Sequence, residues 1–309
     1  MGAIETFSLE KHYRVGFWHN RLKHALKPLT LTVEQGEVFG YLGPNGAGKT
    51  TTLRLLMGLV FPSAGSARIL GRPLDDPWMK SQIGFLPEQP YFYDYLTPKE
   101  LLGYYAALSG VPARDRGRRI DSVLSRVGLA DAVNVQLRKF SKGMLQRVGI
   151  AQAIVHDPRL LFLDEPMSGL DPIGRREVRD LIQELNAEGK TIFFSTHILS
   201  DAETLCHRVA VLNKGELRGV GVVADLARQV SGQVEITYEG TAALHSLADN
   251  AHVSGNIARV VVADRELDRS LDLIRTSGAR LISVTPVQAS LEDYFLQKLE
   301  AHSASEVAR

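Results

Sequence analysis

Residues 43–50 form a glycine-rich segment that constrains the fold of this chain more than any other stretch. The segment fits the pattern G-x-x-x-x-G-K-S/T, and it lies between the apolar run 38–42 and the helix-like segment 51–57. In the order strand, loop and helix, this pattern is typical of a loop that binds nucleotide phosphates. Glycines let successive N–H groups point at one anion, and the helix adds its positive end. We expect the binding residues to be Gly43, Pro44, Asn45, Gly46, Ala47, Gly48, Lys49, Thr50 and Thr51.

Two carboxylates follow a second apolar run. Asp164 and Glu165 come directly after residues 160–163, which read as a buried parallel strand. Because ligands of open α/β sheets bind at the carboxyl ends of the strands, both side chains should lie near the phosphates. We expect Thr50 and Asp164 to hold Mg²⁺ and Lys49 to contact the β- and γ-phosphates. Glu165 is then expected to polarise the attacking water.

A histidine follows a third buried run. His197 comes directly after residues 191–196, so we interpret it as a γ-phosphate contact rather than a structural histidine. The turn 213–216 resembles the guanine-reading pattern N-K-x-D, but Glu216 stands in the fourth place and the usual GTPase switch sequences are missing. These features favour ATP over GTP.

The composition excludes several classes of protein. The 36 Lys and Arg residues balance 35 Asp and Glu, which gives no argument for a nucleic-acid partner. A single cysteine, Cys206, excludes an internal disulfide framework, and we expect it on a helix as a core residue. The N-terminal residues do not read as a signal peptide, and no stretch approaches the ~20 apolar residues of a membrane-spanning helix. We therefore expect a soluble protein whose membrane role, if any, comes through a partner.

The alternation of strand-like and helical segments predicts an α/β fold with two domains. Residues 1–216 are expected to form the nucleotide-binding domain, beginning with short strands before residue 38 and containing an inserted helical subdomain at about 95–157. Within that subdomain, Thr97 and Ser141 are natural N-caps. Residues 217–301 read as a small α+β domain, and residues 302–309 as a frayed tail.

Two aromatic segments allow more than one interpretation. Residues 91–96 contain four aromatic rings, which suit a partner-binding surface better than a core. Residues 13–19 contain basic residues and three further aromatic rings, Tyr13, Phe17 and Trp18. One of these rings could stack on a purine. A packed surface loop explains the second segment equally well.

Taken in order, these motifs resemble the nucleotide-binding subunit of an ABC transporter. Residues 43–50 match its Walker A loop, residues 160–164 its Walker B strand, and Glu165 its catalytic glutamate. The turn 168–171 matches the D-loop through Ser168 and Asp171, and His197 matches the switch histidine. The resemblance covers roughly residues 5–220. It implies a P-loop NTPase core with an inserted α-helical subdomain.

The resemblance also assigns an aromatic ring to the adenine. Tyr13 fits the stacking position best, and Phe17 is a close rival because the intervening loop is long.

Two motifs depart from the general family. The signature Leu-Ser-Gly-Gly-Gln is replaced by Phe140, Ser141, Lys142, Gly143 and Met144, so Met144 stands in the place of the usual glutamine. The loop glutamine that reaches Mg²⁺ is replaced by Glu88, which is followed by Gln89. Both departures resemble the ABC-2-type exporters, whose ATPase subunits carry a C-terminal appendage that ends in a stretch like the Ser-Leu-Glu-Asp of residues 290–293.

This resemblance implies an ATPase that powers export through a separate multi-pass membrane permease, at the cytoplasmic face of the membrane. It implies a head-to-tail homodimer in which Ser141, Lys142, Gly143 and Met144 contact the opposite nucleotide. Mg²⁺ would be held by Thr50, Glu88 and Asp164. The alternatives are a soluble ABC-family ATPase acting on ribosomes or DNA, or a regulator that only binds ATP. The single cassette, the balanced charge and the presence of Glu165 and His197 argue against both. The cargo is not indicated.

Overall fold

The computed structural model describes residues 2–15, 21–228, 233–240, 252–286, 291–292 and 294–295. The chain divides into two compact units, Met1–Gly221 and Val222–Arg309. The sequence placed the division after residue 216, but strand β10 (Glu216–Val222) pairs with β9 in the main sheet of the first unit. The first unit therefore extends to residue 221.

The centre of the first unit is a six-stranded sheet ordered β10-β9-β3-β8-β7-β6. The strands from β9 to β6 run parallel to one another. Every residue of β3, β7 and β8 is buried, which explains why these strands read as continuous apolar runs. The bounds are β3 Val38–Leu42, β6 Ile83–Leu86, β7 Leu160–Asp164, β8 Thr191–Thr196 and β9 Arg208–Asn213.

A second sheet in this unit is antiparallel where its pairing is defined and is ordered β2-β1-β4-β5. The prediction of short strands before residue 38 was wrong, because β1 and β2 are 12 and 13 residues long. Irregular register between Thr6 and His12, with Ser8 at φ 46°, interrupts the alternation of β1 without ending the strand. The bounds are β1 Ile4–Val15, β2 Arg21–Val33, β4 Ala64–Ile69 and β5 Arg72–Pro73.

Helices α1, α6 and α7 of the first unit each follow a strand of the parallel sheet, whereas α2 follows β5. Helix α6 begins at Pro172, because the Asp171 side chain accepts the N–H of Gly174 and caps the helix. Cys206 was predicted to lie on a helix, but α7 ends at Leu205. Burial raises the pKa of its thiol, aided by Glu37 and Asp201, which supports a packing role. The bounds are α1 Lys49–Leu56, α2 Pro77–Ser81, α6 Pro172–Ala187 and α7 Leu199–Leu205.

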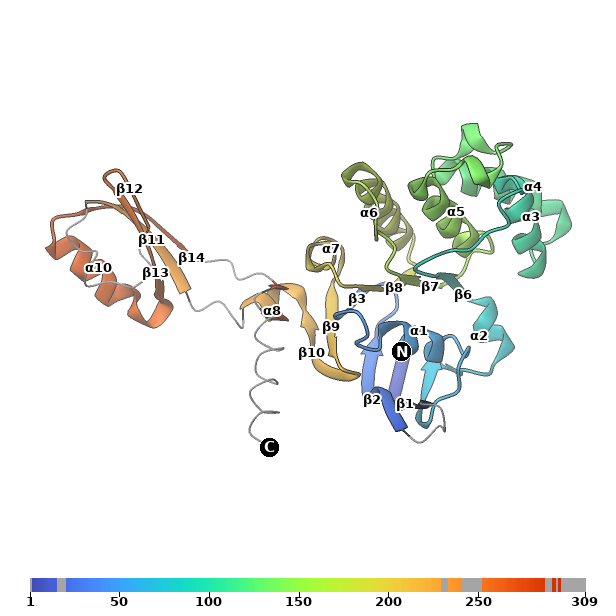
Figure 1. The fold of residues 1–309 in the computed structure, drawn as a ribbon, viewed down its shortest axis with the longest axis horizontal. Coiled ribbons are helices and arrows are strands. Elements are labelled where there is room, and N and C mark those ends of the chain that lie inside the picture. The colour runs from blue at the N-terminus through green and yellow to red at the C-terminus, as the bar shows by residue number, and fades with distance from the viewer. Residues whose placement is uncertain are drawn as a thin grey trace. The chain divides into compact units, whose positions relative to one another are not determined.

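Three helices and two short 3-10 turns occupy residues 98–154, within the predicted helical subdomain. Figure 1 shows α3 (Pro98–Leu108), α4 (Ala113–Arg126) and α5 (Lys142–Ile154) as one group near β6. The predicted caps are confirmed: Thr97 forms a capping box with Glu100, and the Ser141 hydroxyl accepts the N–H of Met144. One hydrophobic core joins these helices to the parallel sheet. The 3-10 turns are Ala130–Ala132 and Leu137–Lys139.

Gly84 allows β6 to approach α5 closely. A Cβ atom at Gly84 would lie 2.1 Å from the carbonyl oxygen of Ala153 and 2.7 Å from Leu161 Cδ2. We expect Gly84→Ala to lower the free energy of unfolding by about 2–3 kcal/mol, because the strand and helix must separate. Urea denaturation followed by circular dichroism measures this.

The matched control is Gly117→Ala, since Gly117 lies inside α4 with open space around it. This change should stabilise the protein by roughly 0.5–1 kcal/mol. Equal stability of the Gly84→Ala variant and the wild type would contradict the argument.

The C-terminal unit is α+β, as predicted. Its antiparallel sheet is ordered β12-β13-β11-β14, and α10 packs Ile274 into a core with Ile236 and Val260. Ser290 and Asp293 of the stretch 290–293 lie outside the described residues, as does the predicted tail 302–309. The bounds are α8 Val223–Arg228, β11 Gln233–Glu239, β12 His252–Ser254, β13 Ile257–Ala263, a 3-10 turn Asp264–Glu266, α10 Leu267–Thr276 and β14 Arg280–Pro286.

Candidate functional site

The glycine-rich loop joins the end of β3 to the start of α1, as predicted. Gly48 precedes the helix at φ 109°, and a Cβ atom there would lie 2.4 Å from the carbonyl oxygen of Ala25. A Cβ atom at Gly43 would lie 2.5 Å from the carbonyl oxygen of Leu212. Both positions therefore require glycine, because backbone carbonyl groups of β2 and β9 leave no room for a Cβ atom.

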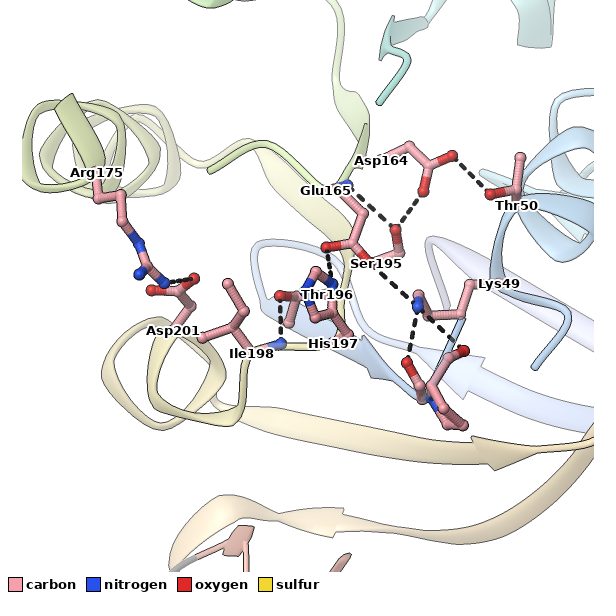
Figure 2. Close-up of polar contacts among 12 residues, drawn as sticks. Lys49, Thr50, Asp164, Glu165, Arg175, Ser195, Thr196, His197, Ile198 and Asp201 are labelled. Atoms are coloured by element: carbon pink, nitrogen blue, oxygen red, sulfur yellow. Dashed lines mark hydrogen bonds and ion pairs between the residues drawn. The ribbon is translucent and has the colours of Figure 1, made fainter. Parts of the chain in front are cut away.

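Lys49 lies at the centre of this loop with only 6% of its side chain exposed. Its ammonium donates a 2.7 Å hydrogen bond to the carbonyl oxygen of Gly43 and lies 3.1 Å from Glu165 Oε1 (Figure 2). Beneath the helix, burial raises the pKa of Tyr41, and a hydrogen bond to Thr52 partly offsets this. The loop thus presents one buried positive charge above a buried, hydrogen-bonded tyrosine.

The carboxyl ends of β7 and β8 carry the predicted acidic residues and the histidine. Glu165 Oε2 lies 2.8 Å from Nδ1 of His197, within hydrogen-bond distance, and Glu165 Oε1 faces Lys49. Glu165 adopts φ 51°, a left-handed conformation that costs a non-glycine residue about 1–3 kcal/mol. Its Oε1 is buried and accepts no aligned hydrogen bond within the described part of the chain. That oxygen can therefore accept a further hydrogen bond beside its ion pair with Lys49.

Thr50 and Asp164 meet at the start of α1. The Thr50 hydroxyl donates to Asp164 Oδ2 at 2.9 Å. Mg²⁺ binds oxygen atoms octahedrally at about 2.0–2.1 Å, so adjacent ligands lie about 2.9 Å apart. This pair of hard oxygen donors therefore fits two neighbouring Mg²⁺ ligands. Among the described residues, no group of three or more His, Cys, Asp or Glu side chains could hold a metal. The ion would need ligands from phosphate and water as well.

A cleft of about 680 Å³ opens over these residues. Its size is typical of a small-molecule site. Tyr13, Glu88, Asp164 and Glu165 line it together with Asn45, Gly46, Gly48, Lys49, Thr50 and Thr51 of the loop. Phe17, the rival of Tyr13, lies outside the described residues.

Several lining residues were missed by the sequence analysis. Lys23 and His24 reach the cleft from β2, where Tyr13 pairs with Lys23 across the antiparallel ladder. Lys214 reaches it from the turn after β9, at φ 47°. The turn 213–216 was noticed in the sequence, but only the fold brings it beside the phosphate loop.

The signature residues do not line this cleft. Ser141 and Lys142 are exposed at the start of α5, and the Met144 side chain packs partly against the helical core. The Lys142 side chain lies over Gly169, where an added Cβ atom would overlap its ammonium. The start of α5 therefore lies beside the turn that contains Ser168 and Asp171.

A partly buried ion pair joins α6 and α7, the helices that follow Asp171 and His197. Arg175, on α6 after Asp171, contacts Asp201, on α7 after His197, at 2.7 Å (Figure 2). The Asp201 side chain is only 3% exposed, so its charge depends on this partner. The pair links the segment around Asp171 to the segment around His197.

The comparisons with known proteins agree with this geometry. The profile of a family described as ABC transporter matches residues 26–168. An ABC transporter ATP-binding protein of Synechocystis sp. is 45% identical over 96% of this chain and 84% of its own length. The chain belongs to the ABC transporter ATP-binding proteins. As a member of this family it is an ATP-binding subunit with an ABC ATPase domain, and its core has the P-loop NTPase fold.

Other relatives of this ABC ATP-binding subunit have more specific names. The bacitracin transport ATP-binding protein BcrA of Bacillus licheniformis is 38% identical over 87% of this chain and 90% of its own length. The linearmycin resistance ATP-binding protein LnrL of Bacillus subtilis is 30% identical over 90% of this chain and 89% of its own.

Solved structures of ABC cassettes share this fold. A structure described as the ATP-binding subunit of an ABC transporter is 33% identical, with a TM-score of 0.65, and the match covers 74% of this chain and 92% of that chain. The ATP-binding cassette MJ0796, solved as a dimer in a post-hydrolysis state with ADP and Pi, is 26% identical with a TM-score of 0.65. That match covers 71% of this chain and 98% of the cassette. Among the described residues of this ABC subunit, no helix is both long and apolar enough to cross a membrane.

Proposed function

We propose that this ABC subunit hydrolyses MgATP as a head-to-tail homodimer and thereby powers export through a separate multi-pass permease. The proposal of catalysis rests on the position of Glu165, which is buried between Lys49 and His197 at the carboxyl end of β7. A carboxylate held beside a cation that binds phosphate can orient the water that attacks the γ-phosphorus.

Each side chain then has a distinct task. The Lys49 ammonium binds the β- and γ-phosphates, and the loop N–H groups complete an anion nest. Glu165 accepts a proton from the attacking water, and His197 orients Glu165 and contacts the γ-phosphate. Thr50, Asp164 and Glu88 would hold Mg²⁺, which neutralises charge on the phosphate oxygens when bound. Tyr13 would stack on the adenine from the cleft wall.

A head-to-tail dimer would explain why the signature residues 141–144 lie outside the cleft of their own chain. Ser141, Lys142, Gly143 and Met144 lie at the N-terminus of a 13-residue helix and do not line the cleft of their own chain. In a head-to-tail dimer they would face the γ-phosphate bound by the other subunit, where the positive helix end favours an anion. The dimeric form of cassette MJ0796 supports this arrangement.

Export is supported by two relatives, which are named for bacitracin transport and linearmycin resistance. We propose that the subunit lies peripherally at the cytoplasmic face of the membrane. The test is to purify Glu165→Gln with ATP from detergent-solubilised membranes. Recovery of a stoichiometric multi-pass protein supports the proposal, whereas recovery of ribosomes or nucleic acid without a membrane protein would favour a soluble ABC ATPase.

The aromatic segment 91–96 is the proposed permease contact. Tyr91 is 92% exposed, and Tyr93 and Tyr95 are more than half exposed, while Phe92 packs partly into the helical core. The segment follows Glu88, which lines the cleft. A movement of Glu88 on nucleotide binding or hydrolysis would therefore be passed directly to residues 91–96.

We expect Tyr91→Ser combined with Tyr93→Ser to reduce co-purification of the permease by at least about 10-fold, because exposed aromatic anchors dominate such interfaces. ATP hydrolysis by the purified soluble subunit should stay within about 2-fold of wild type. Quantitative immunoblotting and phosphate release measure the two effects.

Tyr104, on α3, is also exposed. The variant Tyr104→Ser is therefore a matched control for the removal of an exposed tyrosine side chain. Simultaneous loss of ATPase activity and permease binding in the double variant would instead indicate a structural role for this segment.

A further inference from the structure

Ser195 makes an unusual set of contacts for a residue inside the parallel sheet. Its hydroxyl donates to Asp164 Oδ1 and lies 3.3 Å from the backbone nitrogen of Glu165, which donates to it. The same nitrogen also donates to the Ser195 carbonyl oxygen at 3.1 Å. Figure 2 shows the Ser195 side chain between the two acidic residues. One residue thus contacts both consecutive carboxylate-bearing residues.

These contacts follow from the pairing of β7 with β8. Asp164 and Ser195 are direct partners in the parallel register, near the carboxyl ends of both strands. Ser195 is fully buried, and a buried hydroxyl without partners would be costly. The donor is used by Asp164 and the acceptor by Glu165, so the hydroxyl is satisfied only by the site residues.

The first consequence concerns the orientation of Asp164. Its two carboxylate oxygens accept from hydroxyls on different elements, Oδ2 from Thr50 on α1 and Oδ1 from Ser195 on β8. If Thr50 turns its hydroxyl oxygen toward a metal ion, its proton no longer needs to point at Asp164. Ser195 then remains as the group that holds the carboxylate plane.

The second consequence concerns the direction of Glu165. The chain turns into the left-handed region at this residue, with φ 51°, and the Glu165 N–H is held there by two oxygens of Ser195. This turn directs the Glu165 carboxylate toward Lys49 and His197. A change at Ser195 should therefore move the water-activating group as well as the metal ligand.

We propose that Ser195 is a positioning residue, which aligns Asp164 for the metal and Glu165 for the attacking water. The inference rests on the proposed ATP hydrolysis at this site. Ser195 does not line the cleft. It therefore acts through its two neighbours, in the manner of partners that orient metal ligands from behind.

The test compares Ser195→Ala, Ser195→Thr and the wild type. We expect Ser195→Ala to lower kcat by about 10- to 100-fold and to raise the Mg²⁺ concentration for half-maximal activity by about 10-fold. KM for ATP should change less than about 3-fold, since the phosphate loop is intact. Titration of a fluorescent ATP analogue without Mg²⁺ should give unchanged affinity, whereas its Mg²⁺-dependent binding should need about 10-fold more Mg²⁺. Ser195→Thr keeps the hydroxyl and should restore both properties to within about 3-fold.

Thr191→Val is the matched control, because Thr191 carries another buried hydroxyl at the opposite end of β8, where it accepts the N–H of Gly36. It should lower thermal stability without changing kcat or the Mg²⁺ requirement. If Ser195→Ala fails to fold, the similarly sized Ser195→Cys replaces it, and the same losses are expected.

The outcomes separate this inference from the proposed function. Loss of activity in Ser195→Ala with rescue by Ser195→Thr supports the positioning role. Wild-type kcat and Mg²⁺ dependence in a folded Ser195→Ala variant, or equal losses in Thr191→Val, would overturn it. Absence of ATP hydrolysis in the wild type itself would instead overturn the proposed ATPase function on which it rests.

Discussion

Replacement of Glu165 by glutamine should lower steady-state ATP hydrolysis by about 100- to 10,000-fold while ATP binding persists. Glutamine keeps the shape of the side chain but removes the basic oxygen that accepts a proton from water, and general base catalysis is typically worth that factor. Because Lys49 lies 3.1 Å from Glu165 Oε1, the variant also frees the ammonium from its ion pair. We therefore expect ATP affinity equal to or higher than that of the wild type.

Phosphate release and binding of a fluorescent ATP analogue measure these two properties. The variant should also accumulate as an ATP-bound dimer in size-exclusion chromatography, because hydrolysis no longer separates the subunits. Glu188→Gln, on the exposed end of α6, is the control for the loss of a glutamate charge. Hydrolysis by Glu165→Gln within 10-fold of wild type would show that another group activates the water.

Replacement of Lys49 by methionine should weaken ATP binding by roughly 100-fold. Methionine preserves most of the side-chain volume but removes the charge, and a charge-assisted hydrogen bond contributes about 1.5–3 kcal/mol. The loss should be large because the ammonium is only 6% exposed, so water screens its attraction for phosphate poorly. The variant also leaves Glu165 buried without its cation, which adds repulsion toward the phosphates.

Isothermal titration calorimetry measures the affinity, and circular dichroism checks that the variant is folded. The matched control is Lys27→Met, since Lys27 forms a partly exposed ion pair with Glu216 and lines no part of the cleft. Affinity unchanged in Lys49→Met would mean that the loop N–H groups bind the phosphates without help from this side chain.

The two predictions describe opposite ends of one ion pair. Glu165 and Lys49 neutralise each other across the cleft, so the phosphates of ATP compete with Glu165 for the ammonium. His197 provides Glu165 with a second partner at 2.8 Å. Glu165 can therefore exchange Lys49 for a water molecule without becoming an unpaired buried charge.

The sequence alone determined most of the nucleotide-binding unit. The glycine pattern at 43–50, the buried runs before Asp164 and His197, and the caps Thr97 and Ser141 depend on local backbone geometry and burial. Such features are encoded over a few residues, so they can be read without knowing the fold. Membership of the ABC family followed from the order of these motifs.

Some boundaries were wrong because they depend on pairing between distant segments. The strand β10 joins the first unit because it pairs with β9, although the composition changes near residue 217. The long strands β1 and β2 looked short because bulges break their alternation.

Only the tertiary structure decided which side chains meet in the cleft. Lys23, His24 and Lys214 reach it from β2 and from the turn after β9, and no local pattern marks them as neighbours of the phosphate loop. Ser195 is the clearest case, because no local sequence pattern distinguishes it from the other hydroxyl residues of β8. Its role depends on the parallel register that sets it opposite Asp164. Motifs specify the chemistry of single segments, whereas strand register and burial decide which groups from different segments act together.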